Sequence, residues 1–213
     1  MDGEKYSTEQ IYEIIKQRII HLDYEPGEVL NEVELAKEFG ISRTPVRRVF
    51  QLLQNDKLLN IIPRYGAQVT PIDFKDMKLV FELTRELDPF AVSLAVDRIS
   101  QVELDELEEI MARFNTYSIS SDYQEAINDD ERFHKIIYSS CGNTWLQDIL
   151  NSLHNHTERL WHYCEQYFDS MDLFTDSLGQ VLEAIKKGDT EAAKQYAREH
   201  IDAFVDKIRR DLL

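Results

Sequence analysis

The stretch LNEVELAKEFGISRTPVRR, residues 30–48, decides the fold. Within this stretch, Leu35, Ala36 and Phe39 are spaced to lie on one face of a helix, and Gly40 follows them. Gly40 suits the left-handed position that ends a helix. Ser42 can cap a second helix, and Pro45 is tolerated in its first turn, where backbone N–H groups have no intrahelical partner. The stretch therefore predicts two helices joined by a tight turn.

The segments on either side extend this pair of helices. The second helix continues through a buried stripe made of Val46, Val49, Phe50 and Leu53. Two strand candidates follow, Leu58–Ile62 and Ala67–Val69, separated by the turn Pro63-Arg64-Tyr65-Gly66. Before the stretch, Pro26-Gly27 makes a turn, and helical spacing links Ile11, Ile14, Ile15, Ile19 and Leu22. Three helices followed by a hairpin is the order of a winged helix-turn-helix domain.

Proline and glycine divide the 213-residue chain into two parts. All five prolines lie in the first 89 residues, and the glycines after Pro89 are Gly142, Gly179 and Gly188. A segment so poor in helix breakers predicts long helices joined by short turns. We place the boundary near Thr70–Asp73, because Pro71 restricts the residue before it and Asp73 can cap a helix. The prediction is a mainly α protein, with a winged helix-turn-helix domain over 1–72 and an all-α helical bundle over 73–213.

The second part contains apolar patterns for about six or seven helices. In the first pattern, Pro89 is expected to kink or interrupt the helix. Its apolar residues fall on one face: Leu79, Leu83, Leu87, Phe90 and Leu94. The other predicted helices lie around Leu104–Phe114, around Ala126–Ile137, and over Trp145–Tyr163, Leu173–Lys186 and Thr190–Leu213.

Composition excludes several classes of protein. No run of about 18 apolar residues is present, so no membrane-spanning helix is expected. The N-terminus lacks the basic and then apolar pattern of a secretory signal. Cys141 and Cys164 are the only cysteines, too few for a disulfide scaffold, and the reducing cytoplasm is the expected compartment.

The net charge of −16, taken as a whole, argues against nucleic acid as a partner, but its distribution argues for one. Residues 1–72 hold 9 Lys or Arg and 11 Asp or Glu, whereas residues 73–213 hold 15 and 29. Within Ser42–Arg64 the only acidic residue is Asp56, against Arg43, Arg47, Arg48, Lys57 and Arg64. Because salt screens charges beyond about 8 Å, a local basic patch is what attracts phosphates. The charges therefore predict a nucleic-acid site on the N-terminal domain.

The 30–48 stretch resembles the DNA-binding domain of the GntR superfamily of bacterial transcriptional regulators. The family pattern is roughly L-x-E-x-x-L-A-x-x-x-G-[VI]-S-R-T-P-V-R, with a later wing ending in R-x-G that residues 63–66 fit. The resemblance implies base or phosphate contacts from a double-stranded DNA operator to Ser42, Arg43, Thr44, Arg47, Arg64 and Gly66. The family often has arginine where this chain has Val33, so we expect fewer phosphate contacts from that helix or a shifted operator preference. Arg48 points away from the face that Arg43 and Arg47 share.

One recognition helix covers too few base pairs to select a single genomic site. We therefore predict a homodimer on a pseudo-palindromic operator.

The C-terminal part resembles the all-helical, FCD-type effector domain of the FadR-like branch. The matching pieces are residues 130–134, 141–143, 182–189 and 198–201. Domains of this type commonly hold a divalent metal through one Asp and three His, with the first pair spaced D-x3-H. The resemblance assigns Asp130, His134 and His200 as ligands, but Leu178 occupies the remaining His position.

Three ligands with an open position can still hold zinc, nickel or manganese, with an effector carboxylate or water in the gap. Two alternatives stay open. In one, the pocket is metal-free, and His134 and His200 are hydrogen-bonded core residues. In the other, the site is completed by His154, His156 or His162.

The effector implied by the resemblance is a small molecule such as an organic acid. Loose resemblance places in its pocket Asn143, Arg159, His162 and Tyr163, with surface or packing roles as the alternative. The family frequently has an arginine before a Leu-Glu pair, where this chain has Thr84 and then Leu87-Asp88, although Arg85 is adjacent. A different or larger molecule therefore also stays open.

Together these features predict a ligand-responsive, sequence-specific transcriptional repressor and not an enzyme. The alternative is a metal-dependent hydrolase using Asp130, His134 and His200, although no motif such as H-E-x-x-H supplies a general base. A non-specific architectural DNA protein is disfavoured by the net charge.

Overall fold

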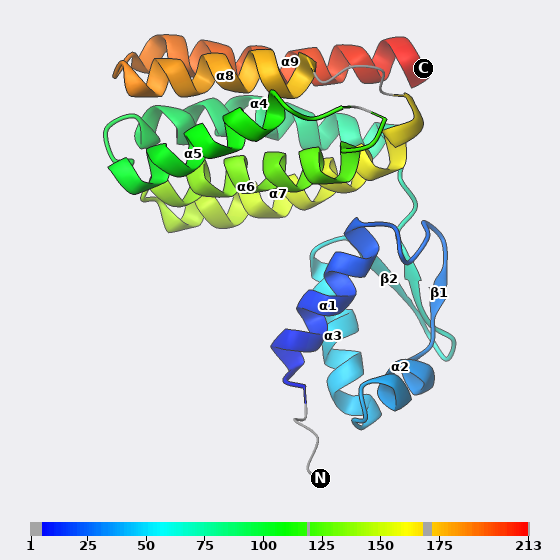
Figure 1. The fold of residues 1–213 in the computed structure, drawn as a ribbon. Helices are drawn as coiled ribbons and strands as arrows, with labels where there is room; N and C mark the ends of the chain where they lie inside the picture. Colours follow the sequence, from blue (N-terminus) through cyan, green and yellow to red (C-terminus); the bar gives the residue numbers. More distant parts are fainter. Residues whose placement is uncertain (1–5, 119, 168–171, 213) are drawn as a thin grey trace. The chain divides into compact units, whose positions relative to one another are not determined.

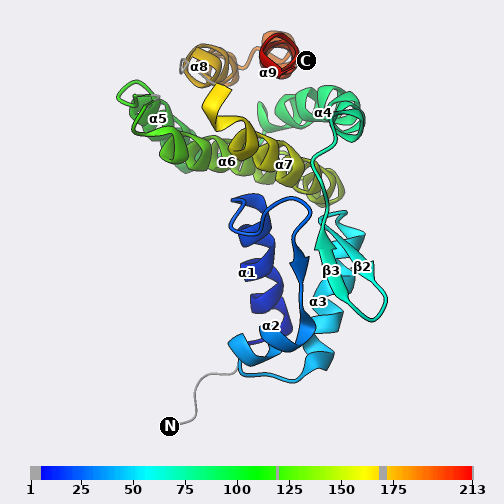
Figure 2. The ribbon, with the colours of Figure 1, turned by 90° about the vertical axis from the view of Figure 1, so that its right-hand side faces the viewer.

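The computed structural model describes residues 6–118, 120–167 and 172–212. These residues form two compact units, one that ends at Asp73 and one that begins at Phe74 (Figures 1 and 2). The first contains a winged helix-turn-helix and the second is all-α, as predicted.

The N-terminal unit consists of three helices and a small antiparallel sheet. The helices are α1 (Thr8–Ile20), α2 (Glu32–Glu38) and α3 (Arg43–Asn55). The strands are β1 (Val29–Leu30), β2 (Leu59–Ile62) and β3 (Gly66–Val69), in the order β1-β3-β2. Side chains bond backbone N–H groups at the start of two helices: Ser7 and Gln10 form a capping box on α1, and Asn31 caps α2.

The strand β1 was not predicted. Its two residues pair with β3, Val29 opposite Gln68 and Leu30 opposite Ala67. A two-residue strand is too short to show the alternation by which strands are recognised. Backbone bonding fixes it instead: Gly27, at a φ of 89°, donates its N–H to the carbonyl of Val69 at 2.9 Å.

A continuous apolar core joins the helices of this unit to its sheet. The stripes predicted for α1 and α3 supply most of it, and the strands supply the rest. Its members include Ile11, Ile15, Ile19, Leu35, Val46, Val49, Phe50, Leu53, Leu58, Leu59, Ala67 and Val69. The core fixes α3 against the sheet and so holds the opposite, charged face of α3 outward.

The C-terminal unit is a helical bundle in its described residues. Its elements are α4 (Phe74–Ala95), α5 (Gln101–Phe114), α6 (Tyr123–Ser140), α7 (Thr144–Cys164), the 3-10 turn η1 (Glu165–Tyr167), α8 (Asp172–Lys186) and α9 (Thr190–Leu212). The helix α4 packs against α6, α7 and α9; α5 packs against α6 and α8, and α8 pairs with α9 (Figure 1). The predicted end of the last helix, Leu213, lies outside the described residues.

The helix α4 differs from its prediction in two ways. It is continuous through Pro89, because packing on neighbouring helices maintains it despite the missing N–H donor. Its predicted apolar face is also not its buried face, since Leu79, Leu83 and Phe90 are exposed. The buried residues are instead Met77, Thr84, Asp88, Pro89, Ala91, Val92 and Ala95. Apolar residues surround this helix on several sides, so periodicity alone could not choose the face.

Candidate functional site

A surface groove of about 380 Å³ on the N-terminal unit gathers several predicted DNA-contacting residues. Three segments line it: the start of α2, the exposed face of α3, and the wing between β2 and β3. The lining residues include Glu32, Val33, Arg43, Arg47, Gln51, Arg64, Tyr65 and Gly66. The fold thus brings Arg43, Arg47, Arg64 and Gly66 to one surface, although the wing is some 20 residues from the start of α3 in sequence.

Arg43 and Arg47 share one carboxylate in this groove. Glu32 Oε2 accepts from Arg43 Nη2 at 2.9 Å and from Arg47 Nε at 2.8 Å. Burial alone would raise the pKa of Glu32, but the two guanidinium groups outweigh burial and lower it. The arginine side chains remain 54% and 58% exposed, so N–H groups are left for an outside acceptor. Sequence spacing did not reveal Glu32, because it lies 11 and 15 residues before its partners.

Ser42 and Thr44 are exposed at the start of α3 and are not part of the groove lining. Ser42 holds the N-cap position in an extended conformation, but its side chain makes no capping hydrogen bond within the described residues. Ser42 thus occupies the predicted N-cap position of α3, but without the expected hydrogen bond from its hydroxyl.

The wing is a tight turn with two residues in left-handed backbone conformations. Arg64 has a φ of 72°, and Gly66 has a φ of 130°. A Cβ atom added to Gly66 would overlap the backbone carbonyl oxygen of Leu30 on β1. Glycine is thus needed here both for the backbone conformation and for the close approach of β1.

Gly66→Ala is expected to destabilise the N-terminal unit by about 1–3 kcal/mol, because β1 must move away from β3 and the backbone is strained. Faster amide hydrogen exchange in β1 and β3 would measure the effect. Gly40→Ala is the matched control: Gly40 also has a left-handed φ, of 64°, but no atom lies within 4 Å of its added Cβ. An equal loss in both variants would mean that the overlap at Leu30 contributes nothing.

The second group of predicted residues meets inside the C-terminal unit. Ligand atoms of Asp130, His134 and His200 lie within 4.8 Å of one another, and all three residues are buried. Asp130 and His134 lie one turn apart on α6, and His200 comes from α9. Leu178 of α8 is buried and has no atom that could bind a metal.

His134 lies at the centre of this cluster. Its Nε2 is 3.7 Å from Asp130 Oδ1, and its Nδ1 is 3.7 Å from Asp88 Oδ1 on α4. The Tyr138 hydroxyl is also 3.4 Å from Nδ1. Ser177 Oγ lies 2.7 Å from Nδ1 of His200. Both histidines thus have a polar neighbour at Nδ1, the kind of outer contact that orients metal-binding imidazoles.

Burial and neighbouring charges shift the pKa values of Asp130 and His134 in opposite directions. Burial raises the pKa of Asp130 to about 6, even though the nearby His134 opposes the shift. Burial alone would lower the pKa of His134, but the carboxylates of Asp130 and Asp88 outweigh it and raise it. For His154 on α7, burial and the neighbouring His134 charge lower the pKa to about 3, so its imidazole is neutral.

The four predicted effector residues are not brought together. Asn143 caps α7 by accepting a hydrogen bond from the Leu146 N–H at 3.2 Å. Arg159 lies near the other end of that helix, about 24 Å away at 1.5 Å per residue. The fold therefore does not bring Asn143 and Arg159 together.

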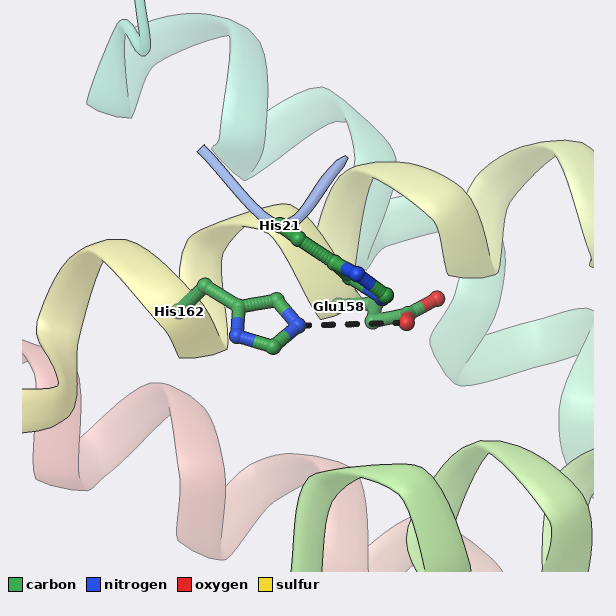
Figure 3. Close-up of side chains that lie close together, drawn as sticks. All are labelled: His21, Glu158 and His162. Carbon is green, nitrogen blue, oxygen red and sulfur yellow. Dashed lines mark ion pairs between the residues drawn. The ribbon is translucent and has the colours of Figure 1, made fainter. Parts of the chain in front are cut away.

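The other three candidates lie near the C-terminal end of α7. Arg159 and His162 are buried, and burial lowers the pKa of Arg159 to about 10. Figure 3 shows His162 beside Glu158 of the same helix, with His162 Nε2 3.9 Å from Glu158 Oε1. Tyr163 is 43% exposed. A buried carboxylate beside His162 makes the immediate surroundings of that residue less favourable for an organic anion.

Two family descriptions match the chain. "Bacterial regulatory proteins, gntR family" covers residues 7–69, and "FCD domain" covers residues 79–203. The chain belongs to the GntR family of regulators and carries an FCD domain. The resemblance drawn from the 30–48 stretch and from residues 130–201 is confirmed.

Relatives and solved structures agree with this membership. The HTH-type transcriptional regulator YdhC of Bacillus subtilis is 29% identical over 208 residues, which cover 95% of this chain and 91% of that protein. The gluconate operon transcriptional repressor of Bacillus subtilis is 23% identical, over 91% of this chain and 82% of that protein. The structure of Escherichia coli McbR/YncC has the same fold, with a TM-score of 0.82 at 22% identity, over 95% of this chain and 97% of that one.

These relatives are named as regulators, so the comparisons support a regulatory protein and give no support to a hydrolase. Among the described helices, none is both long enough and apolar enough to span a membrane.

Proposed function

We propose that this GntR-family protein is a ligand-responsive transcriptional repressor that binds a pseudo-palindromic DNA operator as a homodimer. It would act in the cytoplasm, where bacterial DNA is found. The N-terminal unit would bind DNA, and the FCD domain would bind the effector and pair the subunits.

The observation that carries the proposal is the groove shared by α3 and the wing. Arg43 and Arg47 project from the first turns of α3, and an arginine fork there can bond guanine O6 and N7 in a major groove about 12 Å wide. Arg64 lies across the groove on the wing, where it can meet the backbone or the minor groove. Ser42 and Thr44 are exposed at the N-terminus of α3, and in this proposal they contact a phosphate.

Val33 gives this groove an unusual wall. It lines the groove and is 56% exposed, so an apolar side chain faces the position that DNA would occupy. An apolar side chain can contact a thymine methyl group but cannot bond a phosphate. We therefore expect the operator preference to differ from that of family members with a cation at this position.

The buried cluster fits a divalent cation. Asp130, His134 and His200 provide an oxygen and two imidazole nitrogens, a donor set that suits zinc, nickel or manganese. In addition, Asp130 Oδ1 and Asp88 Oδ1 are buried and make no hydrogen bond with any described residue, and the nitrogens of His134 lie 3.7 Å from them, beyond hydrogen-bond distance. When bound, the ion would supply positive charge and an open coordination position for an effector carboxylate or water. The three ligands would hold it, and Asp88 would orient His134.

Effector binding would act by shifting the population between dimer geometries with different operator affinity. A coupling free energy of about 1–3 kcal/mol is typical of such regulators. An organic acid is the chemical class that an open cation position favours.

Selection from a pool of random duplexes tests the DNA-binding function. The full chain is expected to enrich an inverted repeat whose half-sites are separated by about one helical turn, 10–10.5 base pairs, and to bind it as two subunits. Light scattering of the complex measures the number of subunits. A pool that stays random after repeated selection would contradict sequence-specific binding, and enrichment of a site without symmetry would contradict the dimer.

A further inference from the structure

The cation site of the proposed function has three protein ligands, and a fourth imidazole lies beside them. This side chain is His154 of α7, which is buried. Its ring centroid is 4.9 Å from that of His134, closer than the 5.5 Å between His134 and His200. Two imidazoles on one tetrahedral zinc ion have ring centroids roughly 5 Å apart, because each Zn–N bond is about 2.0–2.1 Å long. The separation of the two rings is thus compatible with a shared ion, although the ligand nitrogens of His154 lie outside the 4.8 Å group formed by the other three residues.

Two buried atoms in this cluster have a lone pair that a single cation could accept. His154 Nε2 and Asp130 Oδ1 each make no hydrogen bond to the parts of the chain that the structure describes. Burying a polar atom in this way costs free energy unless something satisfies it. A cation accepts a lone pair from both atoms at once.

We infer that His154 is the fourth protein ligand of this site and takes the role left open by Leu178. The ligand set is then Asp130, His134, His154 and His200. The inference rests on the proposed cation site, and it replaces the open coordination position of that proposal with a fourth protein ligand. The other three ligand atoms already lie within 4.8 Å of one another, and closing the site requires the His154 side chain to turn toward them.

A fourth ligand changes what the ion does. Three ligands connect only α6 and α9, whereas His154 adds α7. Zinc sites with four protein ligands and no water are typically structural, because no coordination position is left open. The ion would then stabilise the bundle, and the effector would bind without entering its coordination shell.

Zinc affinity tests the inference. The full chain is stripped of metal with a chelator and titrated with Zn²⁺ in competition with a chromogenic chelator. His154→Ala is expected to weaken binding by about 100-fold or more, because the loss of an outer-shell partner alone typically costs 10–100-fold. His156→Ala, two residues along the same helix, is the matched control and should bind zinc as tightly as the parent.

Cobalt absorption gives a readout that a packing role for His154 would not produce. In His154→Cys the thiolate would bind Co²⁺ and give a sulfur-to-cobalt charge-transfer band in the near ultraviolet that the parent lacks. The cysteine variant also keeps the test valid if His154→Ala fails to fold. Trp145 and Trp161 are the only tryptophans and both lie on α7, so their fluorescence reports whether this unit is folded.

The possible results separate this inference from the cation site itself. If the parent binds neither zinc nor cobalt, both are overturned. If His200→Ala loses zinc while His154→Ala keeps parental affinity and His154→Cys shows no thiolate band, the cation site stands and the role of His154 is overturned. A buried water bridging His154 and Asp130 would give that second result.

Discussion

Replacing both Arg43 and Arg47 by alanine is expected to weaken binding to the selected operator by about 2–6 kcal/mol. Each arginine that bonds a base contributes about 1–3 kcal/mol of discrimination. At 1.4 kcal/mol for each tenfold change, the weakest expected loss is roughly 30-fold. Binding isotherms at one fixed salt concentration, for operator and for scrambled duplex, measure the loss. The preference for operator should fall together with the affinity.

The range of about 2–6 kcal/mol is the simple sum of two separate contributions. Because Glu32 couples the two arginines, the loss in the double variant should differ from the sum of the losses in the two single variants. Without them, the Glu32 carboxylate faces the DNA alone and repels phosphates. Adding Glu32→Gln to the double variant should therefore restore part of the affinity but none of the sequence preference. Arg48→Ala is the control, because Arg48 is exposed on the same helix but does not line the groove. Parental operator affinity in the double variant would refute the assignment of α3 as the recognition helix.

The sequence predicts the N-terminal unit well because its signals are local. Gly40 ends α2 with a φ of 64°, and the stripe from Val46 to Leu53 is fully buried. The features of this unit that the sequence could not predict depend on contacts between segments far apart in the chain. The strand β1 exists only because β3 pairs with it, and Glu32 meets Arg43 only after α2 and α3 have packed.

In the C-terminal unit, the spacing of Asp130 and His134 was enough to place both on one helix face, but not to choose their partners. Asp88 is the clearest omission, since an aspartate within an apolar run of α4 gives no local sign that it will face His134. His154 was one of three candidate histidines, and only the folded arrangement of α6 against α7 distinguishes it from His156 and His162.

The second large effect is expected from His134→Leu in metal-free protein, which should destabilise the C-terminal unit by about 3–5 kcal/mol. Asp88 and Asp130 are each only 2% exposed, and a ring nitrogen of His134 lies 3.7 Å from an oxygen of each. Without it, both buried carboxylates lose the imidazole that lies closest between them, and Asp88 keeps only the weaker influence of His200 and Tyr138. Adding Asp88→Asn and Asp130→Asn should restore most of the lost stability. Replacing every member of a buried charge cluster destabilises a protein far less than removing one partner and leaving the others charged. Urea unfolding followed by tryptophan fluorescence measures each variant.

The pH dependence of the same comparison tests the cause. Burial already raises the pKa of Asp130 to about 6, and losing His134 removes a group that lowers it. When the pKa of a carboxyl group is higher in the folded than in the unfolded protein, proton binding favours the folded state. This contribution to the free energy of unfolding is complete below the unfolded pKa and is lost as the pH rises through the folded pKa. The difference in free energy of unfolding between the single and triple variants should therefore become smaller as the pH is lowered from about 8 to about 5. A gap that does not change with pH would mean that lost packing, and not buried charge, destabilises the single variant.

The triple variant also tests whether the buried charged cluster serves to bind a metal ion, since packing of the bundle does not require it. Zinc at a hundredfold excess over its dissociation constant should stabilise the parent by about 2.7 kcal/mol. It should leave the triple variant unchanged, because the variant has lost an imidazole and a carboxylate of the ligand set. If the metal-free triple variant is as stable as the metal-free parent and zinc stabilises only the parent, the cluster is retained for the ion it binds. Equal stabilisation of both by zinc would place the ion elsewhere in the protein.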